Sequence, residues 1–98
     1  MKILLTNDDG IDAPGLAALC EAVSDVGEIR VVAPEAPHSG CSHHATTERP
    51  LHLREVGAGR FAVDGTPVDC VRLGLSEVLA DADWVVAGIN WGGNLGVD

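Results

Sequence analysis

Short apolar runs and one amphipathic segment alternate over about the first 35 residues. Residues 3–5 form an apolar run that is too short for a helix and ends in turn-forming residues, which predicts a buried strand. A helix should follow, with Asp12 as its N-cap, Pro14 in its first turn and Gly27 at its end. Its apolar positions recur at helical spacing: Leu16, Leu19, Cys20 and Val23. Residues 29–33 form a second β-branched run, so the order predicts a right-handed parallel βαβ unit.

The pattern of the second half predicts a hairpin, a helix and another strand. Residues 51–56 and 60–63 surround a glycine-containing turn, which is typical of a β-hairpin. Thr66 starts a helix, because a proline comes next and a carboxylate follows three residues after the hydroxyl. Residues 84–87 predict a third core strand. The buried stripe of the helix is expected to consist of Val68, Val71, Leu75, Val78 and Leu79.

Two irregular stretches interrupt this pattern. Residues 34–50 have no helical or strand periodicity and contain three histidines, and we expect the hairpin to frame this loop. Residues 88–98 contain four glycines and two asparagines. Because the sequence stops in this second loop without a closing helix, residues 1–98 are expected to be the N-terminal part of a single, larger α/β domain.

Charge excludes some partners. Six basic and 15 acidic residues give a formal net charge of −9, which would repel a nucleic-acid duplex or an anionic membrane. No apolar run approaches the roughly 18 residues that span a bilayer. Cys20, Cys41 and Cys70 match neither a disulfide framework nor a zinc motif, so a cytoplasmic location is expected. The acidic excess suits a protein that holds a divalent cation, although most acidic chains are acidic for solubility.

Polar residues gather after the predicted strands, at the ends where parallel α/β sheets bind their ligands. Adjacent carboxylates repel each other unless a cation neutralises them, so Asp8 and Asp9 are candidate ligands for magnesium or manganese. Ser39 and Asn90 could add neutral oxygen ligands. The alternative is that the two aspartates only cap a turn. The residues that follow the three strands are Asn7, Asp8 and Asp9, then His38, Ser39 and Gly40, and finally Asn90 and Asn94.

Other sites are less well supported. Residues 88–96 lack the lysine of a phosphate-binding P-loop and the glycine spacing of a dinucleotide-binding motif. A zinc site at Cys41, His43 and His44 would need a distant fourth ligand. An aspartyl-phosphate phosphatase would need two aspartates separated by one residue, and a receiver domain would need a later lysine, whereas Lys2 is the only lysine.

Ordered motifs along nearly the whole chain resemble the SurE family of metal-dependent survival-protein nucleotidases. The motifs are T-N-D-D-G at 6–10, A-P-G at 13–15, V-V-A-P at 31–34, S-G at 39–40, G-T-P-V-D-C-V at 65–71 and the glycine–asparagine loop at 88–96. The chain departs from the family at Ala87, where serine is usual, and ends before the family's later motifs.

This resemblance implies a Rossmann-like, three-layer parallel α/β sheet with a β-hairpin insertion. It also implies a phosphomonoesterase of the 5'-nucleotidase type that acts on nucleoside monophosphates and assembles as a homo-oligomer, a dimer or tetramer, at full length. One Mg²⁺ or Mn²⁺ ion would be held by Asp8, Asp9, Ser39 and Asn90, with Asp8 also a possible catalytic base. The residues expected to contact substrate or phosphate are Asn7, Gly40, Gly92 and Asn94.

The residues also allow an alternative function and an alternative role for His38. The alternative function is a non-catalytic α/β module that binds a metal or a nucleotide, such as a receiver-like or sensing domain. His38 could protonate a leaving oxygen, but an exposed loop histidine is more common. Residues 1–98 alone are expected to be inactive, because the packing that supports the ligands would be incomplete.

Overall fold

The computed structural model of the chain describes residues 1–37 and 45–88. Its elements in chain order are β1 (Lys2–Thr6), α1 (Pro14–Ala22), β2 (Glu28–Pro34), β3 (Leu53–Gly57), β4 (Arg60–Val63), α2 (Pro67–Leu73), the π-helical turn η1 (Gly74–Val78) and β5 (Trp84–Ala87). Within the described ranges, no helix is long and apolar enough to cross a membrane.

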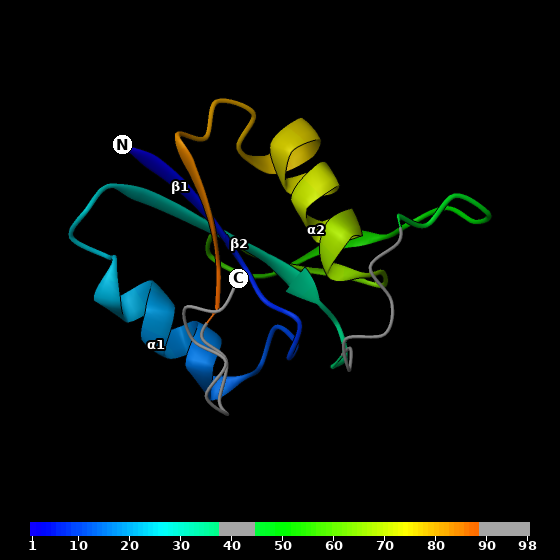
Figure 1. The fold of residues 1–98 in the computed structure, drawn as a ribbon, viewed down its shortest axis with the longest axis horizontal. Coiled ribbons are helices and arrows are strands. Elements are labelled where there is room, and N and C mark those ends of the chain that lie inside the picture. The colour runs from blue at the N-terminus through cyan, green and yellow to red at the C-terminus, as the bar shows by residue number, and fades with distance from the viewer. Residues whose placement is uncertain (38–44, 89–98) are drawn as a thin grey trace, which may run out of the picture.

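The strands of the described residues form one five-stranded sheet in the order β3-β4-β2-β1-β5 (Figure 1). β1 pairs in parallel with both β2 and β5, and β2 pairs in parallel with β4, which confirms the predicted parallel sheet. Only the pairing of β3 with β4 is antiparallel. The second strand of the hairpin, β4, extends the parallel sheet, a role that the sequence did not predict. Four strands consequently direct their carboxyl ends toward one edge.

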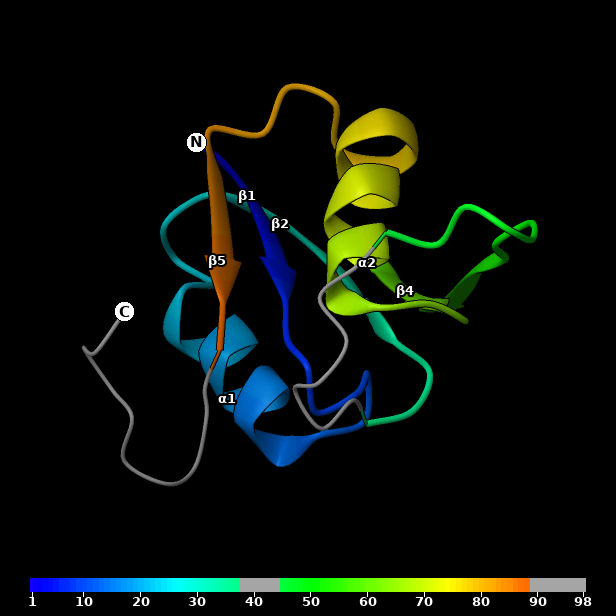
Figure 2. The same ribbon diagram turned by 45° about the vertical axis from the view of Figure 1, so that its right-hand side comes forward.

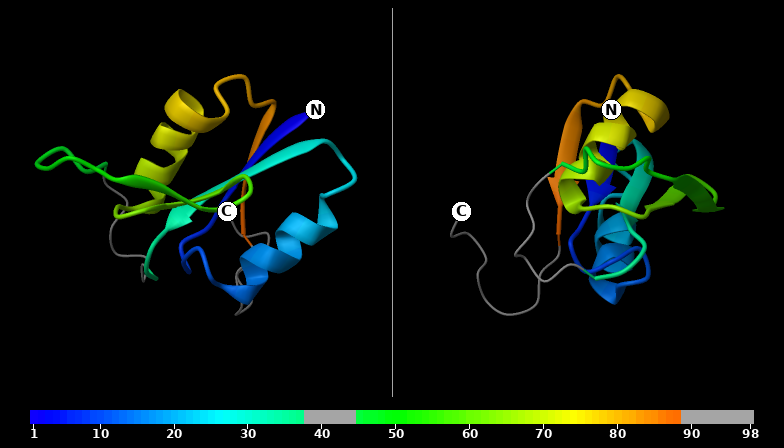
Figure 3. Two further views of the ribbon diagram at one scale, coloured as in Figure 1. Left: turned by 180° about the vertical axis from the view of Figure 1, so that it is seen from behind. Right: turned by 90° about the vertical axis from the view of Figure 1, so that its right-hand side faces the viewer.

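The two helices cover opposite faces of this sheet, as the three-layer prediction requires (Figures 1 and 3). Side chains along β1 alternate between the faces because successive residues of a strand point in opposite directions. The cluster on the α1 face contains Ile3, Leu5, Ile11, Leu16, Val31, Ala33 and Ala62. The cluster on the α2 face contains Leu4, Val32, Val63, Cys70 and Leu79.

The start of α1 differs from the expectation. The N-cap is Ala13, whose extended backbone (φ −66°, ψ 136°) provides the cap geometry without a side-chain hydrogen bond. Asp12 lies one residue before this cap, so its predicted role as the N-cap is wrong. Pro14 at the first helical position and the buried Leu16 define the helix instead, because proline fixes a helical φ and Leu16 anchors the helix to the sheet.

The cap of α2 is as predicted, but the predicted buried stripe is partly wrong. Thr66 and Asp69 form a reciprocal capping box. Leu75, expected to be buried, is 37% exposed. The amide of Leu79 bonds to the carbonyl oxygen of Gly74 at 2.8 Å, five residues back, and this wider turn rotates the apolar positions away from a regular helical stripe. Gly74 faces the sheet, where an added Cβ would lie 2.6 Å from a methyl of Leu4.

β5 is an exposed edge strand and not the core strand that its apolar sequence predicts (Figure 2). Trp84 is 59% exposed and Val85 is 42% exposed. The strand is aligned by pairing with β1 and by the bond from the Lys2 amide to the Asp83 carboxylate, at 2.8 Å. Figure 3 shows the N-terminus beside the loop that enters β5. The apolar sequence correctly predicted a strand here. Whether that strand is buried depends on whether another element packs beside or over it, and β5 is the last strand of the sheet.

Residues 1–98 expressed alone are expected to self-associate and to bind a hydrophobic dye, because β5 presents unpaired backbone groups and apolar side chains. Val85→Lys should reduce both effects, since a lysine on an edge strand opposes edge-to-edge pairing. Light scattering after size-exclusion chromatography and dye fluorescence would measure this. Val26→Lys, at an exposed position in the turn after α1, is the matched control. A monomeric fragment that binds no dye, or an equal effect of both variants, would contradict the prediction.

Candidate functional site

A tight turn directly after β1 carries the predicted acidic pair. Asn7 is 3% exposed and its side chain makes both bonds that close the turn. Asn7 Nδ2 donates to the Gly10 carbonyl oxygen at 2.9 Å, and the Gly10 amide donates to Asn7 Oδ1 at 3.2 Å. Gly10 has a φ of +108°, a conformation that side chains other than glycine rarely adopt. The turn therefore holds Asp8 and Asp9 in a fixed backbone frame.

Asp8 is half-buried and Asp9 is exposed at this turn. Within residues 1–37 and 45–88, no lysine, arginine or histidine forms an ion pair with either of them. The described part of the chain also holds no cluster of three histidine, cysteine or acidic residues that could bind a metal. Two adjacent carboxylates without a basic partner there fit a hard divalent cation, provided that further oxygen ligands join them.

The segments leaving β2 and β5 lie against the acidic turn. The Ile11 amide donates to the Pro34 carbonyl oxygen at 2.8 Å. Gly10 packs on the next residues of that segment, since an added Cβ would lie 3.5 Å from the Pro37 nitrogen. On the other side, the Gly88 amide donates to the Thr6 carbonyl oxygen at 3.1 Å. The chain thus lies against the acidic turn at Pro37, two residues before Ser39, and against the last residue of β1, just before that turn, at Gly88, two residues before Asn90.

The other predicted site residues lie outside the described residues. These are the proposed ligands Ser39 and Asn90, the phosphate-contacting Gly40, Gly92 and Asn94, and the loop residues His38, Cys41, His43 and His44. The structure therefore groups Asn7, Asp8 and Asp9 at one turn, and the remaining assignments stay predictions. The Asn7 amide is engaged with the Gly10 backbone, and its predicted contact with phosphate also stays a prediction.

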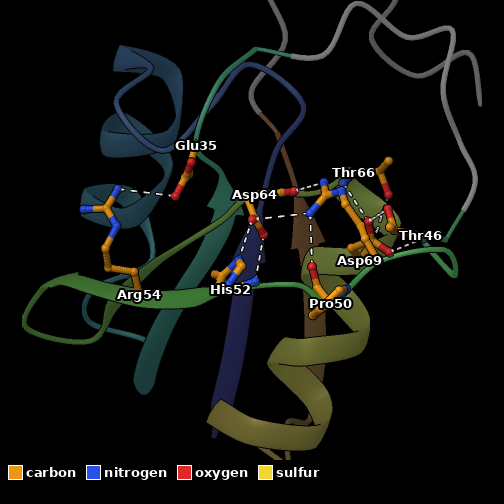
Figure 4. Close-up of polar contacts among 9 residues, drawn as sticks. Glu35, Thr46, Pro50, His52, Arg54, Asp64, Thr66 and Asp69 are labelled. Atoms are coloured by element: carbon orange, nitrogen blue, oxygen red, sulfur yellow. Dashed lines mark hydrogen bonds and ion pairs between the residues drawn. The ribbon is translucent and has the colours of Figure 1, made fainter.

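Asp69, in the first turn of α2, bonds to a segment outside its own helix. Asp69 is fully buried and accepts bonds from the Thr46 amide at 2.7 Å, the Thr46 hydroxyl at 2.5 Å and the Thr66 amide at 2.9 Å (Figure 4). Desolvation raises its pKa, but the hydrogen bonds from Thr46 and Thr66 outweigh this and lower the pKa below its usual value. The sequence indicated the capping role of Asp69, but no signal pointed to Thr46, 23 residues earlier.

A second carboxylate, Asp64, holds the next part of the same segment. The His52 amide donates to Asp64 Oδ1 at 2.7 Å, and His52 Nδ1 lies 2.8 Å from Asp64 Oδ2 (Figure 4). Arg49 Nη1 lies 3.3 Å from the same oxygen. The backbone and side-chain bonds of His52, with the charge of Arg49, lower the pKa of Asp64 to about 2. Asp64 thus binds the start of the hairpin to the end of β4.

A small hollow of about 220 Å³ lies at this edge, between the ends of β2 and β4. Its lining residues are Glu35, Ala36, Val63, Asp64 and Gly65. Glu35 pairs with Arg54 of β3 at 3.5 Å, so part of the charge near the hollow is neutralised. A larger groove of about 490 Å³ lies beside α1 and is lined mainly by α1, Ile11, Val31 and Arg60.

Comparison with known proteins agrees with the motifs in the acidic turn and the α2 cap. The family described as survival protein SurE matches residues 3–98. The chain belongs to the SurE family. A 5'-nucleotidase SurE of Geobacter sulfurreducens is 56% identical over 99 residues, which cover all of this chain and 38% of that protein. A 5'-nucleotidase SurE of Geotalea uraniireducens is also 56% identical, over all of this chain and 40% of that protein.

The fold comparison agrees with the family assignment. The crystal structure of the SurE protein from Aquifex aeolicus matches with a TM-score of 0.90 and 44% sequence identity. The match covers 98% of this chain and 40% of the Aquifex chain. The chain thus spans about two fifths of the length of these SurE relatives, and its fold corresponds to a portion of theirs.

Asp64 should contribute stability that is lost only in strong acid. Its pKa is lower in the folded chain than in the unfolded one, so its contribution is complete above about pH 4 and declines as the pH falls through about 2. Urea unfolding of wild-type full-length protein and Asp64→Asn between pH 6 and pH 2 should give a stability difference that is constant at first and then shrinks below about pH 4. Asp25→Asn, at an exposed turn position, is the control. A difference that stayed constant down to pH 2 would contradict this assignment.

Proposed function

We propose that the full-length protein is a metal-dependent phosphomonoesterase of the 5'-nucleotidase type, which hydrolyses nucleoside monophosphates to a nucleoside and phosphate. The observation that carries this proposal is the convergence of three chain segments. The chain on either side of the turn with Asp8 and Asp9 is bonded to its neighbours: Ile11 to Pro34 at the end of β2, and Thr6 to Gly88 just after β5. Gly10 of the turn also packs against Pro37, so the neighbouring segments come this close two residues before Ser39 and two residues before Asn90. The names of the SurE relatives, which are 5'-nucleotidases, support the same reaction.

The ligand set proposed for the metal is Asp8, Asp9, Ser39 and Asn90, holding one Mg²⁺ or Mn²⁺ ion. Carboxylate, hydroxyl and amide oxygens are the hard ligands that these cations prefer. The absence of a basic partner for Asp8 and Asp9 within the described residues leaves their charge available to a cation. A bound cation supplies Lewis-acid polarisation of a phosphoryl oxygen and neutralises negative charge.

The side chains of the turn and the two loops would then have separate tasks. Asp8 holds the cation and accepts a proton from the attacking water, while Asp9 mainly holds the cation. Backbone amides after Gly40 and Gly92 bind the non-bridging phosphate oxygens, because glycine allows close approach of the backbone. Asn94 lines the substrate site. Asn7 keeps the acidic turn closed through Gly10 and contributes to phosphate binding from that position.

The cellular setting and assembly are part of the same proposal. Cys20 and Cys70 are free thiols, which suits a reducing cytoplasm. A homo-oligomer, either a dimer or a tetramer, is expected for the full-length protein.

Full-length protein should release phosphate from nucleoside monophosphates with Mg²⁺ or Mn²⁺ and lose this activity in chelator. A phosphate-release assay across purine and pyrimidine monophosphates and a generic phosphate ester would measure both. Residues 1–98 alone should release none, because ligand geometry depends on supporting packing. Metal- or nucleotide-induced thermal shifts without any turnover would favour a non-catalytic binding module instead.

Asp8→Asn should abolish phosphate release while leaving the metal-free protein as stable as the wild type or more so, because it relieves repulsion from Asp9. At a metal concentration 100 times Kd, the wild type should gain about 2.7 kcal/mol of unfolding free energy and the variant almost none. Thermal unfolding with and without Mn²⁺ would measure this. Asp12→Asn, an exposed aspartate four residues later, is the matched control and should behave as wild type. If Asp8→Asn also behaved as wild type, the acidic pair would be only a turn cap.

A further inference from the structure

Two aspartates at the carboxyl edge of the sheet bind the same returning segment in the same way. Each accepts the backbone amide and a side-chain group of one residue in that segment. Asp69 takes the amide and hydroxyl of Thr46, at 2.7 and 2.5 Å. Asp64 takes the amide of His52 at 2.7 Å and lies 2.8 Å from its ring nitrogen. The segment from Thr46 to His52 is therefore fixed at both ends (Figure 4).

The two attachments differ in burial and in the space around them. Asp69 is fully buried, and a Cβ added to Gly65 would lie 2.5 Å from its Oδ2 and 2.9 Å from a methyl of Leu51. The Asp69 carboxylate thus lies directly against the backbone of Gly65. The Thr46 amide donates to one oxygen of the Asp69 carboxylate and the Thr66 amide donates to the other. Both oxygens must therefore be acceptors. His52 is exposed and Asp64 is half-buried, so this attachment is more open to solvent than that of Asp69.

The bonds between Thr46 and Asp69 fix one end of the stretch of chain that contains Ser39, a proposed metal ligand. At the other end of the same stretch of chain, Pro34 and Glu35 are fixed by the Ile11 amide and by the Val63 carbonyl oxygen, each bond at 2.8 Å. The chain between these fixed points contains Ser39. Asp69 holds the returning chain at Thr46, seven residues after Ser39, whereas Asp64 contacts the same segment at Arg49 and His52, three and six residues later.

We propose that Asp69 is a positioning residue for the metal site: it fixes, through Thr46, the point at which the chain that carries Ser39 rejoins the domain. This role rests on the proposed function, because Ser39 is one of the proposed ligands. Asp69 touches neither metal nor substrate in this account. Its loss should weaken metal binding beyond what its effect on folding explains, because an unsupported ligand must be ordered when the metal binds.

The test measures Mn²⁺ binding to metal-free, full-length protein by titration calorimetry, together with unfolding by urea. Asp69→Asn places an amide donor where the backbone donors of Thr46 and Thr66 require acceptors, and should raise the Kd for Mn²⁺ about tenfold. Asp64→Asn is the matched control, because it disrupts an equivalent attachment of the same segment. Its Kd should stay close to that of the wild type.

Two variants at Thr46 keep the test decisive if Asp69→Asn folds poorly. Thr46→Val removes the hydroxyl bond but retains the backbone bond, and should raise the Kd about threefold. Thr46→Ser retains both bonds and should restore wild-type binding. Equal Kd values for Asp69→Asn and Asp64→Asn, or for Thr46→Val and Thr46→Ser, would overturn the positioning role while leaving the metal site intact. Wild-type protein that bound no Mn²⁺ would overturn the proposed metal site and this role with it.

Discussion

The candidate site depends on the parallel pairing of β1 between β2 and β5. Parallel neighbours end at the same edge of a sheet, so the residues that follow each strand emerge side by side. Here the Ile11 amide bonds to the end of β2 and the Gly88 amide bonds to the end of β1. Those two bonds place the acidic turn between the segments that lead to Ser39 and Asn90. An antiparallel neighbour on either side would send one of these segments to the opposite edge.

The acidic turn and the buried Asp69 show two different uses of carboxylates at this edge. Asp8 and Asp9 have no basic partner within the described residues, whereas Asp69 accepts three hydrogen bonds from Thr46 and Thr66 and lies 3.5 Å from a guanidinium nitrogen of Arg72. A buried carboxylate remains charged only when such donors compensate for its lost hydration, and its lowered pKa reflects that compensation. Asp69 is thus suited to holding backbone in place, and the acidic pair is suited to holding a cation.

Hydrophobic packing on both faces of the sheet holds the carboxyl ends of its strands in place. β1 sends Leu4 into the cluster under α2 and Leu5 into the cluster under α1, and both side chains are fully buried. Gly74 allows η1 to lie directly on Leu4, which brings α2 close to the sheet. The N-terminus of α2, with its capping box, therefore lies beside the end of β4, where Asp69 meets Thr46. The two hydrophobic clusters thus fix the strand ends that carry the acidic turn and the attachment of Thr46 to Asp69.

Local patterns in the sequence determined the strands, the capping box at Thr66 and the identity of the acidic turn, because each depends on residues within a few positions of one another. The same patterns misassigned the cap of α1, the exposure of Leu75 and the burial of β5. Those properties depend on backbone conformation at Ala13, on a π-helical turn and on what lies beside an edge strand. The pairing of Asp69 with Thr46 was equally out of reach, since no periodicity links positions 23 residues apart. Only the tertiary structure decided these contacts, because they arise where segments distant in sequence pack against each other.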